Sequence, residues 1–392
     1  MTNASMALFM CDDYGYSILG DDEDPDDLKT DYVTLLTELH HGQRTLPLSA
    51  ETIAYDHRLL LLSKVIFGSN LIEKAGGPLD ITRKLVQLLC YHGMWDAVPP
   101  TINPHDPVYH VLKDYLTAHS RPSDPPSIIR SYREIVQHIK AACHLMDSFD
   151  PRIPITEPLL LSTHRILTQG IPTDQGIPSA SYSGLYRQDQ VVAGLHAFPP
   201  AEQVPAATRK MISSLNHDLQ QGDKIDPVAL AAKYSHRLVN IHPFLDGNGR
   251  MCRLLLNVLL YKLGSSLACF GQTEDEREEY LGIAARASQN MAAQQDDWDD
   301  DNDDMAPKYH KELASYTLKY AVESLKGWKH VLDESEKALE EDGNALKGDE
   351  RALMHVLEAK FRGPNKPSDG SEDLFKALFS ASTGVENGLT GI

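Results

Sequence analysis

The residues best suited to chemistry in this chain lie close together, between His242 and Arg253. The stretch begins His-Pro-Phe-Leu-Asp-Gly-Asn-Gly-Arg and leads into an apolar run at positions 254–260. A histidine, a carboxylate, two glycines around an asparagine and two arginines are more functional groups than an ordinary turn contains. The sequence therefore predicts a catalytic or binding site here.

Two helices are expected to position this stretch. Asp226-Pro227 is typical of a helix start, with the aspartate as N-cap and the proline in the first turn. Apolar residues then recur at helical spacing up to Ile241. His242 should therefore lie at the end of the first helix, which Pro243 stops.

The second helix is expected to run from Arg250 to Lys262, with Gly264 as its C-terminal stop. A glycine-rich loop that leads into a helix presents unpaired N–H groups and the positive end of the helix dipole, which together suit a phosphate. This helix is apolar almost all round, yet Arg250, Arg253 and Asn257 share one stripe. That stripe must face a polar site.

Two side chains of the loop suit phosphate chemistry. Asp246 is an oxygen ligand beside the expected phosphate, and Mg²⁺ typically takes one or two carboxylates and completes its shell with phosphate oxygens and water. His242 can take a proton from an attacking hydroxyl. The alternative, a plain connecting turn with His242 as a capping side chain, leaves two arginines on an apolar helix unexplained.

Residues 242–253 resemble, without a mismatch, the signature of the Fic family, His-x-Phe-x-(Asp/Glu)-Gly-Asn-Gly-Arg-x-x-Arg. The resemblance implies transfer of AMP from ATP to a Ser, Thr or Tyr hydroxyl of a target protein, with release of pyrophosphate. It implies His242 as the general base and Asp246 as the Mg²⁺ ligand. The nucleotide-binding residues that it implies in this stretch are Asp246, Gly247, Asn248, Gly249, Arg250 and Arg253. A related kinase branch has Lys at the position of Gly249.

A second stretch, Ser69 to Glu73, resembles the inhibitory motif of the same family, Ser/Thr-x-x-x-Glu followed by Gly or Asn. The resemblance implies that Glu73 pairs with Arg253 and occupies space that the γ-phosphate of ATP needs. Lys74 departs from the pattern at the position after the glutamate. The alternative is that Glu73 lies on a solvated helix face with no regulatory role.

Between residues 179 and 200 the helical period disappears, and 184–196 reads as a short hairpin. It resembles the flap of the family, a β-hairpin whose exposed edge aligns a target segment by strand addition; a plain surface hairpin is the alternative. By the same resemblance we assign Gly194 to nucleotide binding and place Tyr280 near the adenine.

The expected fold class is mainly α, with a Fic-type helical core, one small β-hairpin flap and extra N- and C-terminal helices. The predicted regions are an acidic, irregular and partly disordered N-terminus (1–48), an N-terminal helical region (49–129) with an inhibitory helix (51–74), a catalytic core (130–295), an Asp-rich loop (296–309), C-terminal helices (310–361) and a flexible tail (362–392).

Composition limits the partners and the compartment. The formal net charge of −19 weighs against nucleic-acid and anionic-membrane binding. The five cysteines are odd in number and form no CxxC pair, which indicates neither a disulfide framework nor a zinc site. No apolar run is long enough to span a membrane. We therefore expect an intracellular protein, cytoplasmic or nuclear; a homodimer is left open.

The function predicted is a protein adenylyltransferase that uses ATP and Mg²⁺, modifies an exposed hydroxyl of a protein substrate and is autoinhibited by Glu73. Three alternatives remain open. The site could remove AMP from a modified target, or it could use another nucleotide or a phosphocholine donor. From another class, the chain could be a non-catalytic interaction module with the same fold.

Overall fold

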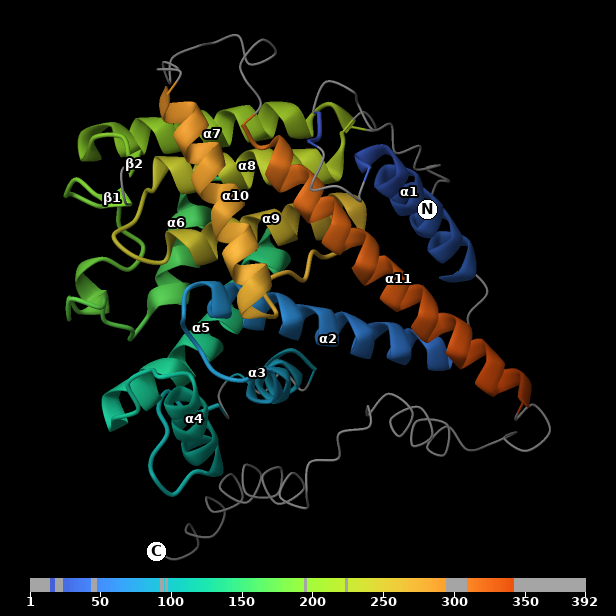
Figure 1. The fold of residues 1–392 in the computed structure, drawn as a ribbon, viewed down its shortest axis with the longest axis horizontal. Coiled ribbons are helices and arrows are strands. Elements are labelled where there is room, and N and C mark those ends of the chain that lie inside the picture. The colour runs from blue at the N-terminus through green and yellow to red at the C-terminus, as the bar shows by residue number, and fades with distance from the viewer. Residues whose placement is uncertain are drawn as a thin grey trace, which may run out of the picture.

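The computed structural model describes residues 15–17, 24–43, 48–91, 95, 98–193, 196–222, 225–293 and 309–341. Helices make up nearly all of the regular structure in these ranges, so the predicted mainly α class is confirmed (Figure 1). None of the helices in these ranges has the length and apolar character needed to cross a membrane. The helices are α1 (Pro25–Gln43), α2 (Leu48–Ile72), α3 (Leu79–Val86), α4 (Pro107–Ala118), α5 (Pro125–Ser148), α6 (Glu157–Thr168), α7 (Val204–Leu219), α8 (Pro227–Ile241), α9 (Asn248–Gly264), α10 (Glu274–Ala293) and α11 (Lys311–Glu341), with a π-helical turn at Gln87–Tyr91 and 3-10 turns at Ser179–Ser181 and Ala201–Gln203.

Helix α9 is the centre of the core. Of its 17 residues, 13 are buried, as expected for a helix that is apolar almost all round. Helices α2, α5 and α8 all contact it, and α10 crosses in front of it in the view of Figure 1. The few polar side chains of α9 therefore point toward other helices rather than toward solvent.

Helix α1 differs from the prediction of an irregular segment up to residue 48. Its acidic first turn suits the positive end of the helix dipole. Tyr32, Leu35, Leu36 and Leu39 are buried and follow the spacing of one helix face. This face packs against α11, which lies beside α1 in Figure 1. The density of acids near the N-terminus concealed a regular apolar pattern.

The predicted hairpin is represented by two very short strands. Strand β1 (Val192–Ala193) pairs antiparallel with β2 (His196–Ala197), with Val192 opposite Ala197 and Ala193 opposite His196. Gly194, which we assigned to nucleotide binding, lies between them and outside the described residues. The end of the predicted C-terminal helical region, 342–361, and the aspartates of the 296–309 loop also lie outside them.

Asp226 begins α8 as predicted and is fully buried. Its carboxylate accepts hydrogen bonds from the N–H groups of Val228 (3.0 Å) and Ala229 (3.1 Å). It also accepts one from the hydroxyl of Tyr16, at 2.8 Å, which ties the N-terminal segment to the core. Because burial disfavours the charged form, the pKa of Asp226 is raised in spite of these hydrogen bonds.

We predict that Asp226→Ala lowers the free energy of unfolding by about 2 to 3 kcal/mol, because two N–H groups and a hydroxyl lose a buried acceptor. Urea denaturation followed by circular dichroism measures the loss. Asp124, which caps α5 from an exposed position, is the matched comparison. Asp124→Ala should cost less, and equal losses would contradict the importance of burial.

Candidate active site

The predicted helix–loop–helix is present between α8 and α9. His242 ends α8 with a left-handed backbone conformation (φ +50°), and Gly247 precedes α9 with φ +80°, which favours glycine. Helix α9 begins at Asn248, two residues before the predicted start at Arg250. The loop is therefore shorter, and more of the motif lies in the first turn of α9.

Asn248 closes the loop on itself. Its side-chain oxygen accepts a hydrogen bond from the N–H of Phe244 (2.9 Å), and its side-chain amide donates to the carbonyl of Phe244 (2.8 Å). Both ends of the amide are thus used within the loop. The side chain of Asn248 therefore holds the loop, and its backbone N–H is one of the donors at the N-terminus of α9.

His164, on α6, fastens the loop from outside and was not found by sequence reasoning. Its ring stacks on Phe244, with centroids 3.7 Å apart. Its Nδ1 accepts from the N–H of Gly184 (2.9 Å), so Nε2 donates to the carbonyl of Asp246 (2.9 Å). Burial lowers the pKa of His164 to about 3, so the ring stays neutral with its proton on Nε2.

Arg187 holds the loop from the side of the hairpin and was also missed. It is buried, and its Nε donates to the carbonyl of His242 (2.7 Å) while Nη2 donates to the carbonyl of Pro199 (2.5 Å). Its own backbone N–H donates to the carbonyl of Pro243 (3.0 Å). One side chain thus joins the base of the hairpin to the start of the loop.

The ring of His242 is held in one orientation. It stacks on Phe198 with centroids 3.9 Å apart, and its Nδ1 lies 3.2 Å from the carbonyl oxygen of Val239. A carbonyl can only accept, so Nδ1 carries the proton in the neutral ring and Nε2 has the basic lone pair. This is the protonation pattern that a general base needs.

The first turn of α9 offers donors for an anion. The N–H groups of Asn248, Gly249 and Arg250 have no acceptor within the helix, and they lie at the positive end of the helix dipole. The Arg250 side chain is only 3% exposed, and its Nε and Nη1 have no protein acceptor in the described ranges. Because buried donors without acceptors are unfavourable, this arrangement fits a bound phosphate.

Asp246 lies at the edge of the same turn. Its Oδ1 accepts from the N–H of Gly247 (2.6 Å) and lies 3.6 Å from Nη2 of Arg250, and its side chain is 31% exposed. A carboxylate that reaches solvent beside phosphate donors fits Mg²⁺, which completes its shell with phosphate oxygens and water. The described residues contain no group of three or more acidic, His or Cys side chains that could hold a metal. Any Mg²⁺ at Asp246 would therefore depend on ligands from the nucleotide.

Arg253 is paired with the predicted inhibitory residues. The guanidinium is 2% exposed; Nη2 lies 2.7 Å from Oε1 of Glu73, and Nε donates to the hydroxyl of Ser69 (2.9 Å). Burial would raise the pKa of Glu73. The charge and hydrogen bond of Arg253, helped by Arg250 and His242, outweigh it and lower that pKa below its ordinary value.

The carboxylate of Glu73 lies directly on the first turn of α9. A Cβ added to Gly249 would come within 2.0 Å of Oε1 of Glu73 and 3.1 Å of Nη1 of Arg253. Glycine is therefore required at this position while Glu73 occupies the site. The carboxylate takes up the space next to the helix N-terminus that an anion would use.

Lys74 ends the helix of Glu73 in the left-handed conformation, with φ +51°. The N–H of Ala75 donates to the carbonyl of Asn70 (2.9 Å), and the N–H of Lys74 donates to the carbonyl of Leu71 (2.9 Å), which is the Schellman arrangement. A lysine pays about 1 to 2 kcal/mol for this backbone conformation. The departure from Gly or Asn thus strains the helix end without changing its path.

Tyr280 contributes to the site through Arg253. The centre of the Arg253 guanidinium lies 5.4 Å from the centroid of the Tyr280 ring, which stacks on Phe270. Tyr280 is only 4% exposed. In this structure it packs behind the arginine, and its contact with adenine stays a prediction.

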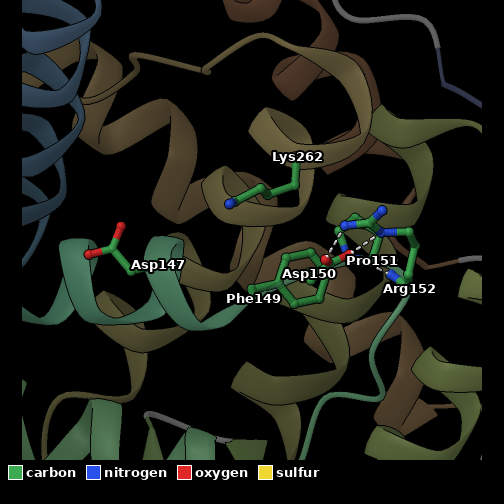
Figure 2. Close-up of a pocket in the computed structure, with 6 residues that line it drawn as sticks. All are labelled: Asp147, Phe149, Asp150, Pro151, Arg152 and Lys262. Atoms are coloured by element: carbon green, nitrogen blue, oxygen red, sulfur yellow. Dashed lines mark hydrogen bonds and ion pairs between the residues drawn. The ribbon is translucent and has the colours of Figure 1, made fainter. Parts of the chain in front are cut away.

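The hollow in Figure 2 is separate from the motif. It is lined by Asp147, Phe149, Asp150, Pro151, Arg152 and Lys262. Lys262 lies near the end of α9, about 20 Å along the helix from its first turn. In Figure 2 the guanidinium of Arg152 pairs with the carboxylate of Asp150, so these charges neutralise each other. No predicted site residue reaches this hollow.

Two buried arginines, Arg250 and Arg253, lie in the first two turns of α9, and the ring of His242 is held at the other end of the loop. These groups fit a site that binds an anion and accepts a proton. The Fic/DOC family matches residues 154–260, which include α6, the hairpin, α8 and most of α9. The chain therefore contains a Fic/DOC family domain.

Sequence relatives agree with this assignment. A protein adenylyltransferase Fic from Drosophila grimshawi is 32% identical over 136 residues, which cover 35% of this chain and 26% of that protein. A Fido domain-containing protein from Dictyostelium discoideum is 38% identical over 81 residues, or 21% of this chain and 56% of the relative. The chain thus spans about a quarter of the Drosophila protein that it matches, and the relationship to Fic adenylyltransferases is distant.

Solved structures share the fold over a longer part of the chain. Fic-1 from C. elegans aligns with a TM-score of 0.50 and 18% identity over 79% of this chain and 75% of the other. A Fic domain containing signaling protein from Bacteroides thetaiotaomicron aligns with a TM-score of 0.50 and 22% identity over 78% and 98%. The helical fold of this chain is thus Fic-like.

We predict that His164 makes stability depend on pH. Its folded pKa, about 3, lies below the ordinary value of 6.5, so the unfolded chain binds the proton first as the pH falls. The free energy of unfolding should therefore fall by about 1.4 kcal/mol per pH unit between about pH 6.5 and pH 3 on account of this one group. His164→Gln can still donate to the carbonyl of Asp246 but does not titrate. In urea denaturation at pH 7, 6 and 5, its free energy of unfolding should therefore fall less steeply with pH than that of the wild type. Parallel pH profiles for the two proteins would contradict the neutral, buried imidazole.

Proposed function

We propose that this chain is a protein adenylyltransferase, which transfers AMP from ATP to a Ser, Thr or Tyr hydroxyl of a target protein. The observation that carries the proposal is the state of Arg250. Its Nε and Nη1 are buried at the N-terminus of α9 without an acceptor among the residues that the structure describes. A phosphate of the nucleotide supplies the missing acceptor. The name of the Drosophila relatives supports the reaction type.

The proposed reaction is an in-line displacement at the α-phosphorus. Nε2 of His242 takes the proton of the target hydroxyl while its oxygen attacks. The new bond joins this oxygen to the α-phosphorus, the bond to the bridging oxygen of the β-phosphate breaks, and pyrophosphate leaves. The stacking on Phe198 and the hydrogen bond to Val239 keep the imidazole oriented for this step.

The first turn of α9 and Arg250 are the proposed recipients of the charge that develops on the phosphate oxygens. Their donors are already oriented, because Asn248 and His164 hold the loop through buried hydrogen bonds. Asp246 is the proposed Mg²⁺ ligand, and the ion, when bound, would neutralise charge on the nucleotide phosphates. The protein partner presents an exposed hydroxyl side chain.

We also propose that Glu73 inhibits the transfer. Its carboxylate pairs with Arg253 and lies against Gly249, so a γ-phosphate would meet a negative charge and an occupied arginine. Placing two like charges together costs several kcal/mol. Occupation of the site by Glu73 should therefore keep ATP from binding in a productive geometry.

Removal of AMP from a modified target is the second candidate function. The Glu73 carboxylate lies against Gly249 at the first turn of α9, which is a position from which it could orient a water in this site. In that reaction Glu73 would be required rather than inhibitory. Replacement of Glu73 therefore separates the two functions by the sign of its effect.

We predict that His242→Ala, made in the Glu73→Gly background where the proposed inhibition is removed, lowers AMP transfer by about 10² to 10⁴, the usual effect of losing a general base. Incubation with ATP labelled at the α-phosphate and a target protein, followed by gel autoradiography, measures the transfer. His119→Ala, at an exposed histidine that follows α4, is the control. Equal labelling by Glu73→Gly and by the double variant Glu73→Gly, His242→Ala would remove His242 from the mechanism.

We predict that Glu73→Gly raises auto-AMPylation at least about tenfold, because it removes a charge repulsion of several kcal/mol from the γ-phosphate position. Lys74→Gly is the matched control, since it changes the same turn but keeps the carboxylate. It should leave labelling low. Labelling that stays unchanged or falls in Glu73→Gly would exclude inhibition, and loss of AMP removal from a modified target would favour the second candidate.

A further inference from the structure

The turn that follows Glu73 is held at Gly76 by three side chains. The N–H of Gly76 donates to Oε2 of Glu134 at 2.6 Å. Its carbonyl accepts from the hydroxyl of Ser131 (2.7 Å) and from Nη1 of Arg121 (2.9 Å). Both backbone groups of one residue are therefore fixed by side chains that lie far away in the sequence.

Glu134 is an unusual residue for the middle of a helix packed in the core, since it is only 2% exposed. Its Oε1 accepts from Nε of Arg130 at 2.9 Å, and its Oε2 lies 3.9 Å from Nη2 of Arg121. Burying a carboxylate is costly unless cations and hydrogen bonds compensate it. This carboxylate is compensated, and the backbone N–H that it captures is the one of Gly76.

The start of the same segment is also held by α5. Nδ1 of His138 lies 2.9 Å from Oδ1 of Asn70 and donates to it, and His138 is fully buried. Ser131, Glu134 and His138 share one face of α5, at spacings of three and four residues. Asn70 and Gly76 lie three residues before and after Glu73, so α5 fixes the chain on both sides of the inhibitory carboxylate.

We propose that Glu134 is a positioning residue for inhibition: by holding Gly76, it sets how often Glu73 leaves Arg253 and opens the site to ATP. This inference rests on the proposed inhibition by Glu73. The side chain of Glu73 is 38% exposed, and Arg253 is its one ion-pair partner among the described residues, so the carboxylate can leave whenever another anion takes its place on Arg253. The backbone of the turn must therefore keep it in place.

The test compares auto-AMPylation of the full chain in wild type and in Glu134→Gln. Glutamine at this position has no charge to attract Arg121 and Arg130, and its side chain has one acceptor oxygen in place of the two of Glu134. Labelling should rise roughly 5- to 30-fold, the population change expected for losing one charge-assisted hydrogen bond. Ser131→Ala should raise it in the same direction by a smaller factor. Asp147→Asn, at an exposed carboxylate of α5, should change nothing.

Nucleotide affinity gives a readout that general destabilisation does not mimic. In calorimetry with Mg²⁺, Glu134→Gln should bind ATP more tightly and leave ADP binding unchanged, because only the γ-phosphate competes with Glu73. In a Glu73→Gly background the same substitution should affect neither labelling nor ATP affinity. Thermal melts of all variants check that they are folded.

Two results would overturn the inference while leaving the proposed function intact. One is Glu134→Gln labelling within twofold of wild type while Glu73→Gly labels strongly. The other is an equal loss of labelling from Glu134→Gln in both backgrounds, which would make Glu134 merely structural. If Glu73→Gly itself failed to raise labelling, the proposed inhibition would be wrong, and the role of Glu134 with it.

Discussion

A buried guanidinium needs an anion, and the requirement of Arg253 for one shapes this site. Leaving such a charge unpaired costs several kcal/mol. In this structure Glu73 supplies the anion, and Ser69 and the ring of Tyr280 complete the surroundings. If Glu73 withdraws, another anion has to replace it, and the N-terminus of α9 beside it is built for a phosphate. In the proposed function, Glu73 and a nucleotide phosphate are thus alternative partners of Arg253.

The loop between α8 and α9, where we propose that the phosphate binds, is already held in place by hydrogen bonds within the protein. The side-chain amide of Asn248 both accepts from and donates to the backbone of Phe244. His164, on α6, donates to the carbonyl of Asp246, and Arg187 donates to the carbonyls of His242 and Pro243 through its side chain and its backbone N–H. These contacts are buried and directional, so the loop cannot relax when charge changes on the ligand. Preorganised donors of this kind stabilise developing charge without the cost of reorientation.

Sequence reasoning found the parts of the site that are contiguous and missed those assembled by the fold. His242 to Arg253 is a single stretch, and two helices with clear start and stop signals flank it. Glu73 could be found because its motif is also local. His164, Arg187 and Glu134 are single residues in ordinary helical or turn contexts, and only tertiary packing shows what they contact. The fold class followed from helical periodicity. Helix α1 was missed, because the acids clustered just before it and in its first turn suggested disorder.

In the proposed function, the turn between Asn70 and Gly76 decides whether Glu73 or a nucleotide phosphate pairs with Arg253. The rigidity of this backbone matters more than the strength of the ion pair itself. The buried charge of Arg253 needs an anion, but a nucleotide phosphate can supply one as well as Glu73 can. Lys74 adds strain next to Glu73. A glutamate on a flexible turn would therefore yield readily to a nucleotide with several negative charges. The buried hydrogen bonds at Asn70 and Gly76 remove the backbone freedom that such a release requires. In the proposed inhibition, the ion pair is effective because a rigid turn presents the carboxylate of Glu73 to Arg253.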